Sequence, residues 1–267
     1  MGRPMGEASD RTGAAKSGDG AALPVVDPPE LAAPVTPDRR GLTELAVGFG
    51  LALAGLVVFA LLAANLYDQE AVALDTFVNP FLHSISSPAL DAVMNAITAL
   101  GSAPILVTVT VLAVVLLLSR GRRARALFVV TAIAGSVALN GTLKVAVERP
   151  RPVLAWSRVL PDFSFPSGHT MNALVLYLAL ALIIWVSFGS RIGVASFVAA
   201  IVLSLLVGFS RLYLGYHYLS DVVGGFAAGI AWLLVVALAF EIGPRTSLRR
   251  RRPDPARRSG VARRPAG

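Results

Sequence analysis

The sequence predicts an all-α, polytopic membrane protein: a bundle of six transmembrane helices with one further helix at the outer interface. Of its 267 residues, 55% are hydrophobic and only 15% are charged, and the mean hydropathy is +0.68. These values lie far from the average of soluble proteins. Several uncharged runs are long enough to cross a bilayer. The chain has no cysteine, which excludes disulfides and metal sites with Cys ligands.

Two polar tails flank the apolar part of the chain. Residues 1–41 mix Gly, Pro, Ala, Asp and Arg without apolar periodicity, so we expect a disordered N-terminal tail. No apolar core typical of a signal peptide lies near Met1, and the first apolar run is expected to remain as an anchor. Residues 243–267 are predicted to be a second, basic disordered tail, suited to anionic lipid rather than nucleic acid. Residues 42–242 form the predicted six-span domain.

The first half of this domain contains two predicted spans and the interfacial helix. Leu45–Tyr67 is uncharged and long enough to cross. Between Asp68 and Asp91, apolar residues recur at steps of three and four, which predicts an amphipathic helix at the membrane surface. Ala92–Ser119 is interrupted at residues 101–104 by Gly-Ser-Ala-Pro. We therefore expect a short leading helix, a break and then a second span.

The second half contains four further predicted spans, each bounded by charged or polar residues. They are Ala126–Leu143, Thr170–Ser190, Ile192–Ser210 and Val222–Phe240. Six spans place both termini on one side of the membrane.

The charges of the loops predict the orientation. Residues 120–125 between the second and third spans are rich in arginine, whereas the segment from Asp68 to Asp91 has no Lys or Arg. The positive-inside rule therefore makes both termini cytoplasmic in a multi-pass protein of the cell membrane. Counting spans from the cytoplasmic N-terminus places six ionisable side chains near the outer, extracytoplasmic face: Lys144, Arg151, His169, Arg211, His217 and Asp221.

These side chains belong to three motifs. The motifs are Lys144 with Arg151-Pro152, then Pro166-Ser167-Gly168-His169, then Ser210-Arg211 with His217 and Asp221. In this order the sequence resembles the type 2 phosphatidic acid phosphatase (PAP2) family of integral membrane lipid phosphatases. The family pattern is Lys-x6-Arg-Pro, Pro-Ser-Gly-His and Ser-Arg-x5-His-x3-Asp, and no motif position departs from it. Arg149-Pro150 is interpreted as a decoy, because Thr142 stands where its lysine would be.

The residue types suit phosphoryl transfer. Negative charge spreads over the equatorial oxygens of the transition state, so catalysis depends on fixed cations and hydrogen-bond donors. Lys144, Arg151 and Arg211 would supply the positive charge. Backbone N–H groups near Ser167 and Gly168 would add the anion site of a helix N-terminus.

Two histidines and one carboxylate would carry out the covalent steps. His217 is the predicted nucleophile, which attacks phosphorus through a neutral imidazole nitrogen to form a phosphohistidine. Asp221, four residues later, would orient His217. His169 would protonate the leaving oxygen and then help to activate water. This scheme needs neither a metal nor a cofactor.

The predicted substrate is a membrane lipid with a phosphomonoester or pyrophosphate headgroup. A polyprenyl diphosphate such as undecaprenyl diphosphate and a lipid of the phosphatidic acid type both fit. A lipid phosphotransferase with the same intermediate, and a non-catalytic scaffold or transporter, remain as alternatives. Headgroup contact or simple solvation is the expectation for four other polar residues near this face, namely His83, Arg149, Arg158 and Asp162, and Glu148 is expected only to screen the neighbouring cations.

Overall fold

The computed structural model describes residues 39–158 and 160–240, and within these ranges every regular element is an α-helix. Residues 1–38 and 241–267, which include most of the two predicted tails, lie outside the described residues. The predicted all-α class is confirmed for the part of the chain that the structure describes.

Five helices are long and apolar enough to cross a membrane. They are α1 (Arg39–Ala64), α5 (Arg123–Val147), α6 (Gly168–Phe188), α7 (Ser190–Tyr213) and α8 (Leu219–Ala239). Two shorter helices, α3 (Pro88–Ala99) and α4 (Ala103–Ser119), meet at an angle of 43° and pass the same test as a pair. Counted as one broken span, this pair brings the described residues to the six spans that the sequence predicts.

The break between α3 and α4 lies at the predicted position. Pro104 stands in the first turn of α4, where its missing N–H is not needed for the helix ladder. Gly101 lies against α6 and α7, because a Cβ there would stand 2.6 Å from the Val207 side chain and 3.2 Å from the carbonyl of His169. The break therefore lets α3 and α4 pack closely against the beginning of α6.

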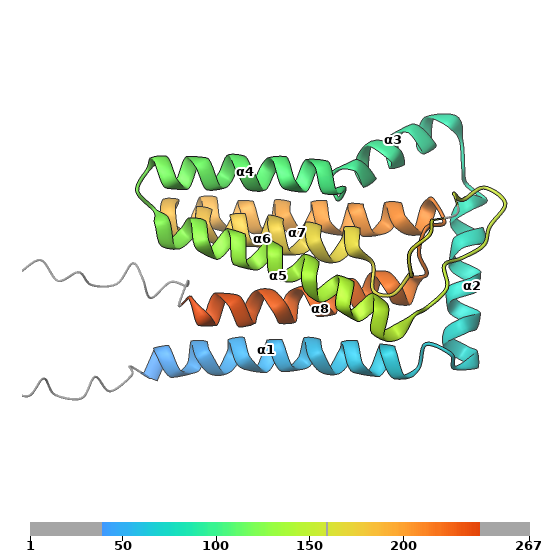
Figure 1. Cartoon of the computed structure of the whole chain (residues 1–267), viewed down its shortest axis with the longest axis horizontal. Helices are drawn as coiled ribbons and strands as arrows, with labels where there is room; N and C mark the ends of the chain where they lie inside the picture. Colours follow the sequence, from blue (N-terminus) through green and yellow to red (C-terminus); the bar gives the residue numbers. More distant parts are fainter. Residues whose placement is uncertain (1–38, 159, 241–267) are drawn as a thin grey trace, which may run out of the picture. The chain divides into compact units, whose positions relative to one another are not determined.

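Helix α6 lies at the centre of the bundle and contacts α4, α5, α7 and α8, whereas α1 packs along α8 (Figure 1). The core between these helices is aliphatic and aromatic, and its fully buried members include Phe128, Val129, Ala173, Leu176 and Val207. Successive long helices run in opposite directions. The C-termini of α5 and α7 and the N-termini of α6 and α8 consequently meet at one end of the bundle (Figure 1).

Helix α2 (Gln69–His83) lies across this same end, where the sequence predicts an interfacial helix (Figure 1). Its apolar side chains Leu74, Phe77 and Phe81 are more than half exposed, whereas Asp75 and Asn79 are each only 2% exposed. The polar face of α2 is thus turned toward the bundle and its apolar face outward. The buried side chains of Asp75 and Asn79 therefore lie at the end of the bundle where the three motifs meet.

Candidate active site

The segment that follows α5 carries two arginines, Arg149 and the first-motif residue Arg151. Lys144 lies in the last turn of α5, and Glu148 ends the helix in a left-handed conformation with φ of 50°. The prolines at 150 and 152 prevent the helix from resuming. Arg149 and Arg151 are therefore held on non-helical backbone that passes beside the ends of α6 and α8.

A cavity of about 290 Å³ lies where the helix ends meet. Six of the predicted site residues line it: Lys144, Arg151, Gly168, His169, Arg211 and His217. They come from α5, the loop after it, α6, α7 and the loop after α7. The structure thus brings together side chains that are up to 73 residues apart in the sequence, as the motif pattern predicts.

The charges that line this cavity do not balance. Of the described carboxylates, only that of Asp162 lines the cavity with Lys144, Arg151 and Arg211. Arg211 is 4% exposed, donates to Thr98 Oγ1 at 3.0 Å, and has a buried Nε without a hydrogen-bond partner. None of the described carboxylates forms an ion pair with it. A buried cation without a counter-charge is costly, and an excess of two positive charges matches a phosphate dianion.

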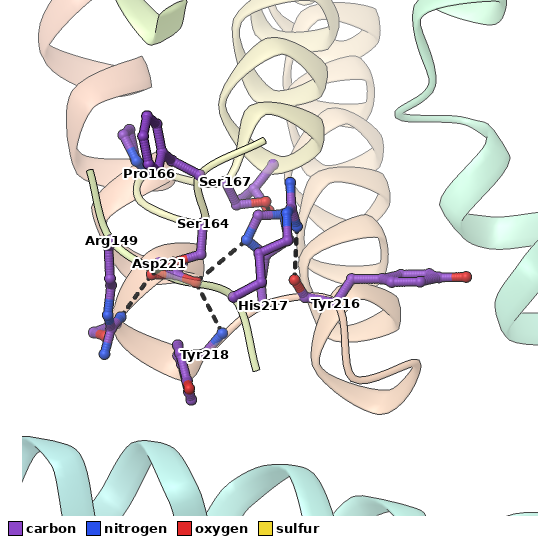
Figure 2. A network of polar contacts seen from close by, with 12 residues as sticks. Arg149, Ser164, Pro166, Ser167, Tyr216, His217, Tyr218 and Asp221 are labelled. Atoms are coloured by element: carbon purple, nitrogen blue, oxygen red, sulfur yellow. Dashed lines mark hydrogen bonds and ion pairs between the residues drawn. The ribbon is translucent and has the colours of Figure 1, made fainter. Parts of the chain in front are cut away.

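The His217 and Asp221 side chains form a buried pair beside the cavity. Asp221 Oδ2 lies 3.3 Å from His217 Nδ1 and accepts from the backbone N–H of Tyr218 at 2.9 Å. Its other oxygen, Oδ1, accepts from Arg149 at 2.6 Å. Figure 2 shows Arg149 and His217 approaching the Asp221 carboxylate from opposite sides. The four-residue spacing in the motif therefore does bring the carboxylate to the imidazole.

The contacts of His217 fix its tautomer. Its Nε2 lies 3.1 Å from Arg151 Nη1, and a guanidinium can only donate, so Nε2 accepts and the proton sits on Nδ1, facing Asp221. Burial lowers the pKa of His217 to about 4, and the opposing effect of Asp221 is smaller. At neutral pH the imidazole is uncharged, with a lone pair on the nitrogen next to the cations that are predicted to bind phosphate. This is the form that a nucleophile requires.

The first residues of α6 meet the expectations from the sequence only in part. His169 lines the cavity, and its ring makes no hydrogen bond with any described group, so the ring is available to a ligand. Gly168 also lines the cavity, and a Cβ there would stand 2.8 Å from Asn140 Oδ1, so close packing on α5 requires glycine.

Ser167 differs from the expectation. The backbone N–H of Ser167 donates to the carbonyl of Asp221 at 3.0 Å, and the residue is fully buried. That amide is therefore engaged in joining α6 to α8 and is not free for phosphate. Gly168 and His169, as the first residues of the helix, retain the orphan N–H groups of a helix N-terminus.

Comparison with known proteins agrees with this geometry. The model of the PAP2 superfamily matches residues 125–242. Phosphatidylglycerophosphatase B of Bacillus subtilis (strain 168) is 33% identical over 180 residues, which cover 67% of this chain and 89% of that protein. The chain belongs to the PAP2 superfamily. As a member of this family of phosphatases, it is a phosphatase.

Two further relatives support the assignment to PAP2. The undecaprenyl-diphosphatase BcrC of B. subtilis (strain 168) is 36% identical over 107 residues, covering 38% of this chain and 50% of that one. The crystal structure of a transmembrane PAP2-type phosphatidylglycerolphosphate phosphatase from B. subtilis is similar with a TM-score of 0.68 at 30% identity. It covers 75% of this chain and 98% of the solved chain. The multi-pass membrane architecture is therefore shared with a solved PAP2 protein.

Arg149 is buried and not solvated, contrary to the expectation from the sequence, although it does not line the cavity as Arg151 does. It is 4% exposed and forms ion pairs with two carboxylates, Asp221 at 2.6 Å and Asp75 at 2.7 Å. The motif comparison misses it because it occupies a variable position between Lys144 and Arg151. The repeated Arg-Pro at residues 149–152 was the available signal, since both arginines are held on the same non-helical segment.

Helix α2 also contributes residues that the sequence reasoning misses. Asn79 donates from its Nδ2 to the carbonyls of Leu212 at 3.0 Å and His217 at 3.1 Å. It thereby fastens the loop that carries His217 to α2. Asp75, one helical turn earlier, lies on the same buried face. A pair of polar residues four apart, opposite an apolar stripe, was the available sequence signal.

Asp162 is exposed, as the sequence predicts, but it also pairs with two of the predicted phosphate-binding cations. Its carboxylate accepts from Arg151 Nη2 at 2.8 Å and 2.9 Å and from Lys144 Nζ at 2.9 Å, although the side chain is 52% exposed. Burial would raise the pKa of Asp162, but Lys144 and Arg151 outweigh burial and hold it below the ordinary value. In the free PAP2 phosphatase, this carboxylate engages the two cations that would hold phosphate oxygens.

We expect Asp162→Asn to bind inorganic phosphate more tightly than the wild type, by about three- to tenfold, because a competing negative charge is removed from partly exposed cations. Isothermal titration calorimetry on the purified full chain in detergent measures the dissociation constant. Glu148→Gln, which removes an exposed acid from the same loop, is the matched control and should bind as the wild type does. Weaker binding by Asp162→Asn would mean that Asp162 holds the cations in place instead of competing with phosphate.

Proposed function

We propose that this phosphatase hydrolyses a membrane lipid with a phosphomonoester or diphosphate headgroup, at the extracytoplasmic face, through a phosphohistidine on His217. The observation that carries the proposal is the cavity with an excess of two positive charges beside the accepting Nε2 of His217. A phosphate held by Lys144, Arg151 and Arg211 would lie next to that lone pair.

The proposed reaction has two chemical steps. His217 Nε2 forms a bond to phosphorus while the bond from phosphorus to the leaving oxygen breaks, and protonated His169 gives its proton to that oxygen. Neutral His169 then takes a proton from the water that attacks the phosphohistidine, which releases inorganic phosphate and restores His217. Asp221 accepts from Nδ1 throughout and stabilises the charged ring of the intermediate.

The remaining lining of the cavity supports a lipid substrate. Leu106 and Val107 of α4 and Ile133 and Val137 of α5 form its apolar part. Val107 and Val137 are also more than half exposed on the outside of the bundle. A headgroup in the cavity could therefore leave its hydrocarbon chain against α4 and α5, in contact with the bilayer. The names of the relatives, a phosphatidylglycerophosphatase and an undecaprenyl-diphosphatase, point to the same substrate class.

The loop charges support the extracytoplasmic face. The connection between α4 and α5 and the first turn of α5, at the end away from the cavity, together contain four arginines. By contrast, residues 65–102, which include α2 and α3 at the cavity end, contain no Lys or Arg. The positive-inside rule places the arginine-rich loop in the cytoplasm. The cavity would then open toward the outer side.

The first test measures phosphate release from phosphatidylglycerophosphate, undecaprenyl diphosphate and phosphatidic acid, together with acid-labile phosphoenzyme. We expect His217→Ala to lose both, and His169→Ala to form phosphoenzyme but to hydrolyse it slowly, because only the proton transfers are impaired. Turnover should persist in EDTA, because Lys144, Arg151 and Arg211 already supply the positive charge that a metal ion would contribute. Phosphoenzyme in His217→Ala, or activity that requires added magnesium, would contradict the proposed mechanism.

The second test addresses the side of the membrane. Val153, which is 88% exposed in the loop near the cavity, and Arg120, exposed at the end of α4, are replaced singly by Cys in this cysteine-free chain. An impermeant thiol reagent applied to intact cells should label position 153 and not 120, whereas both should react after the cells are opened. Labelling of 120 alone in intact cells would place the cavity on the cytoplasmic side.

A further inference from the structure

A second buried carboxylate lies behind the pair of His217 and Asp221. Asp75 of α2 is 2% exposed and does not line the cavity. Its Oδ1 accepts from the backbone N–H of Ser220 at 2.9 Å, and its Oδ2 accepts from Arg149 Nη2 at 2.7 Å and from the hydroxyl of Ser220. Asp75 therefore binds both the first turn of α8 and the segment after α5. A buried carboxylate with this many partners is a fixed charge and not a surface group.

Arg149 connects this carboxylate to the active site. One guanidinium nitrogen, Nη2, contacts Asp75, and the other, Nη1, donates to Asp221 at 2.6 Å and to Ser220 Oγ at 2.7 Å. The guanidinium also lies over the ring of Tyr218, with Cζ 4.3 Å from the centroid. An unbroken series of contacts thus runs from α2 to the cavity, through Asp75, Arg149, Asp221, His217 and Arg151.

The charges along this series determine what Asp221 can do for His217. If Arg149 were the only charged group paired with it besides His217, Asp221 would be largely neutralised and would stabilise a positive imidazole weakly. Asp75 supplies a second negative charge, so that two carboxylates and one guanidinium leave one net negative charge behind the neutral ring. That charge is balanced when His217 becomes positive on attacking phosphorus.

We propose that Asp75 and Arg149 are positioning residues of the phosphatase reaction: Arg149 fixes the Asp221 carboxylate, and Asp75 offsets the charge of Arg149 so that Asp221 can stabilise the phosphohistidine. This inference rests on the proposed role of His217 as the nucleophile. It assigns to α2, the interfacial helix, a direct part in preparing the active site.

The proposal has a signature in the pH profile. The charged and titratable groups that face His217 are Asp221 from α8, Arg211 from α7, His169 from α6 and Arg151 from the loop after α5. The neutral ring is the active form, so kcat/KM falls as the pH drops through the pKa of His217, about 4. Removing the negative charge of Asp75 lowers this pKa further, whereas removing the positive charge of Arg149 raises it.

The experiment compares Asp75→Asn, Arg149→Gln and the double variant, each as the full chain purified in detergent. All are assayed with the same lipid substrate, so that ionisation of the substrate phosphate affects every pH profile equally and does not contribute to the differences between them. We expect kcat to fall about ten- to a hundredfold in each single variant, as for other supporting hydrogen-bond partners, while KM changes little. The acid limb of kcat/KM should move down by about half a pH unit in Asp75→Asn and up in Arg149→Gln. In the double variant, which restores the net charge, it should return to the wild-type position.

Controls separate this role from folding and from the proposed function itself. Glu70→Gln removes an exposed acid from the first turn of α2 and should match the wild type. Size-exclusion chromatography and thermal unfolding report whether each variant is folded. Arg149→Lys keeps the positive charge, so its acid limb of kcat/KM should stay at the wild-type pH. This variant tests the proposal even if Arg149→Gln does not fold. A wild-type kcat in Asp75→Asn would overturn the proposal. So would a lower kcat in the single variants if the acid limb of kcat/KM stayed at the wild-type pH. Full activity of His217→Ala would instead refute the proposed function.

Discussion

The Asp221 carboxylate sets the constraint on which the rest of the site depends. It is fully buried at the start of α8, and removing one partner of a buried ion pair typically costs about 3–5 kcal/mol. Its partners come from separate parts of the chain: Arg149 after α5, Tyr218 and His217 after α7, and, through its backbone carbonyl, Ser167 before α6. Satisfying this one carboxylate therefore aligns three loops at the same end of the bundle. The alignment leaves His217 Nε2 facing the cavity.

The cavity itself is arranged for a ligand and not for the stability of the free protein. Three cations lie near one another, and Arg211 is buried with an unpaired Nε. Asp162 relieves part of the repulsion by pairing with Lys144 and Arg151, but it comes from an exposed position on a loop. Fixed positive charge of this kind stabilises the transition state because it needs no reorganisation during the reaction. For the same reason, we expect phosphate to bind this site strongly.

The sequence predicts the helices well because each helix is determined by residues that are close together in the chain. Uncharged runs of spanning length predict the long helices, and Gly101 to Pro104 predict the break between α3 and α4. The residues Lys144, His169, Arg211 and His217 could be placed together because short motifs at helix ends meet once the helices alternate in direction. The contact between Arg149 and Asp75 could not be predicted, because it joins residues 74 positions apart and depends on which face of α2 turns inward. An amphipathic pattern is the same for either orientation. Ser167 shows the same limit: only the packing of α6 on α8 reveals that its amide is already engaged.

The most direct test of the account is a structure of the full chain with bound vanadate, which mimics the five-coordinate transition state of phosphoryl transfer. We predict a covalent bond from vanadium to His217 Nε2, with Lys144, Arg151 and Arg211 donating to the vanadate oxygens and the Asp162 carboxylate displaced from the two cations. His169 should lie on the side opposite His217, next to the apical oxygen. A bond from vanadium to His169, or vanadate held away from these three cations, would contradict the central claim that His217 is the nucleophile of a site charged for phosphate.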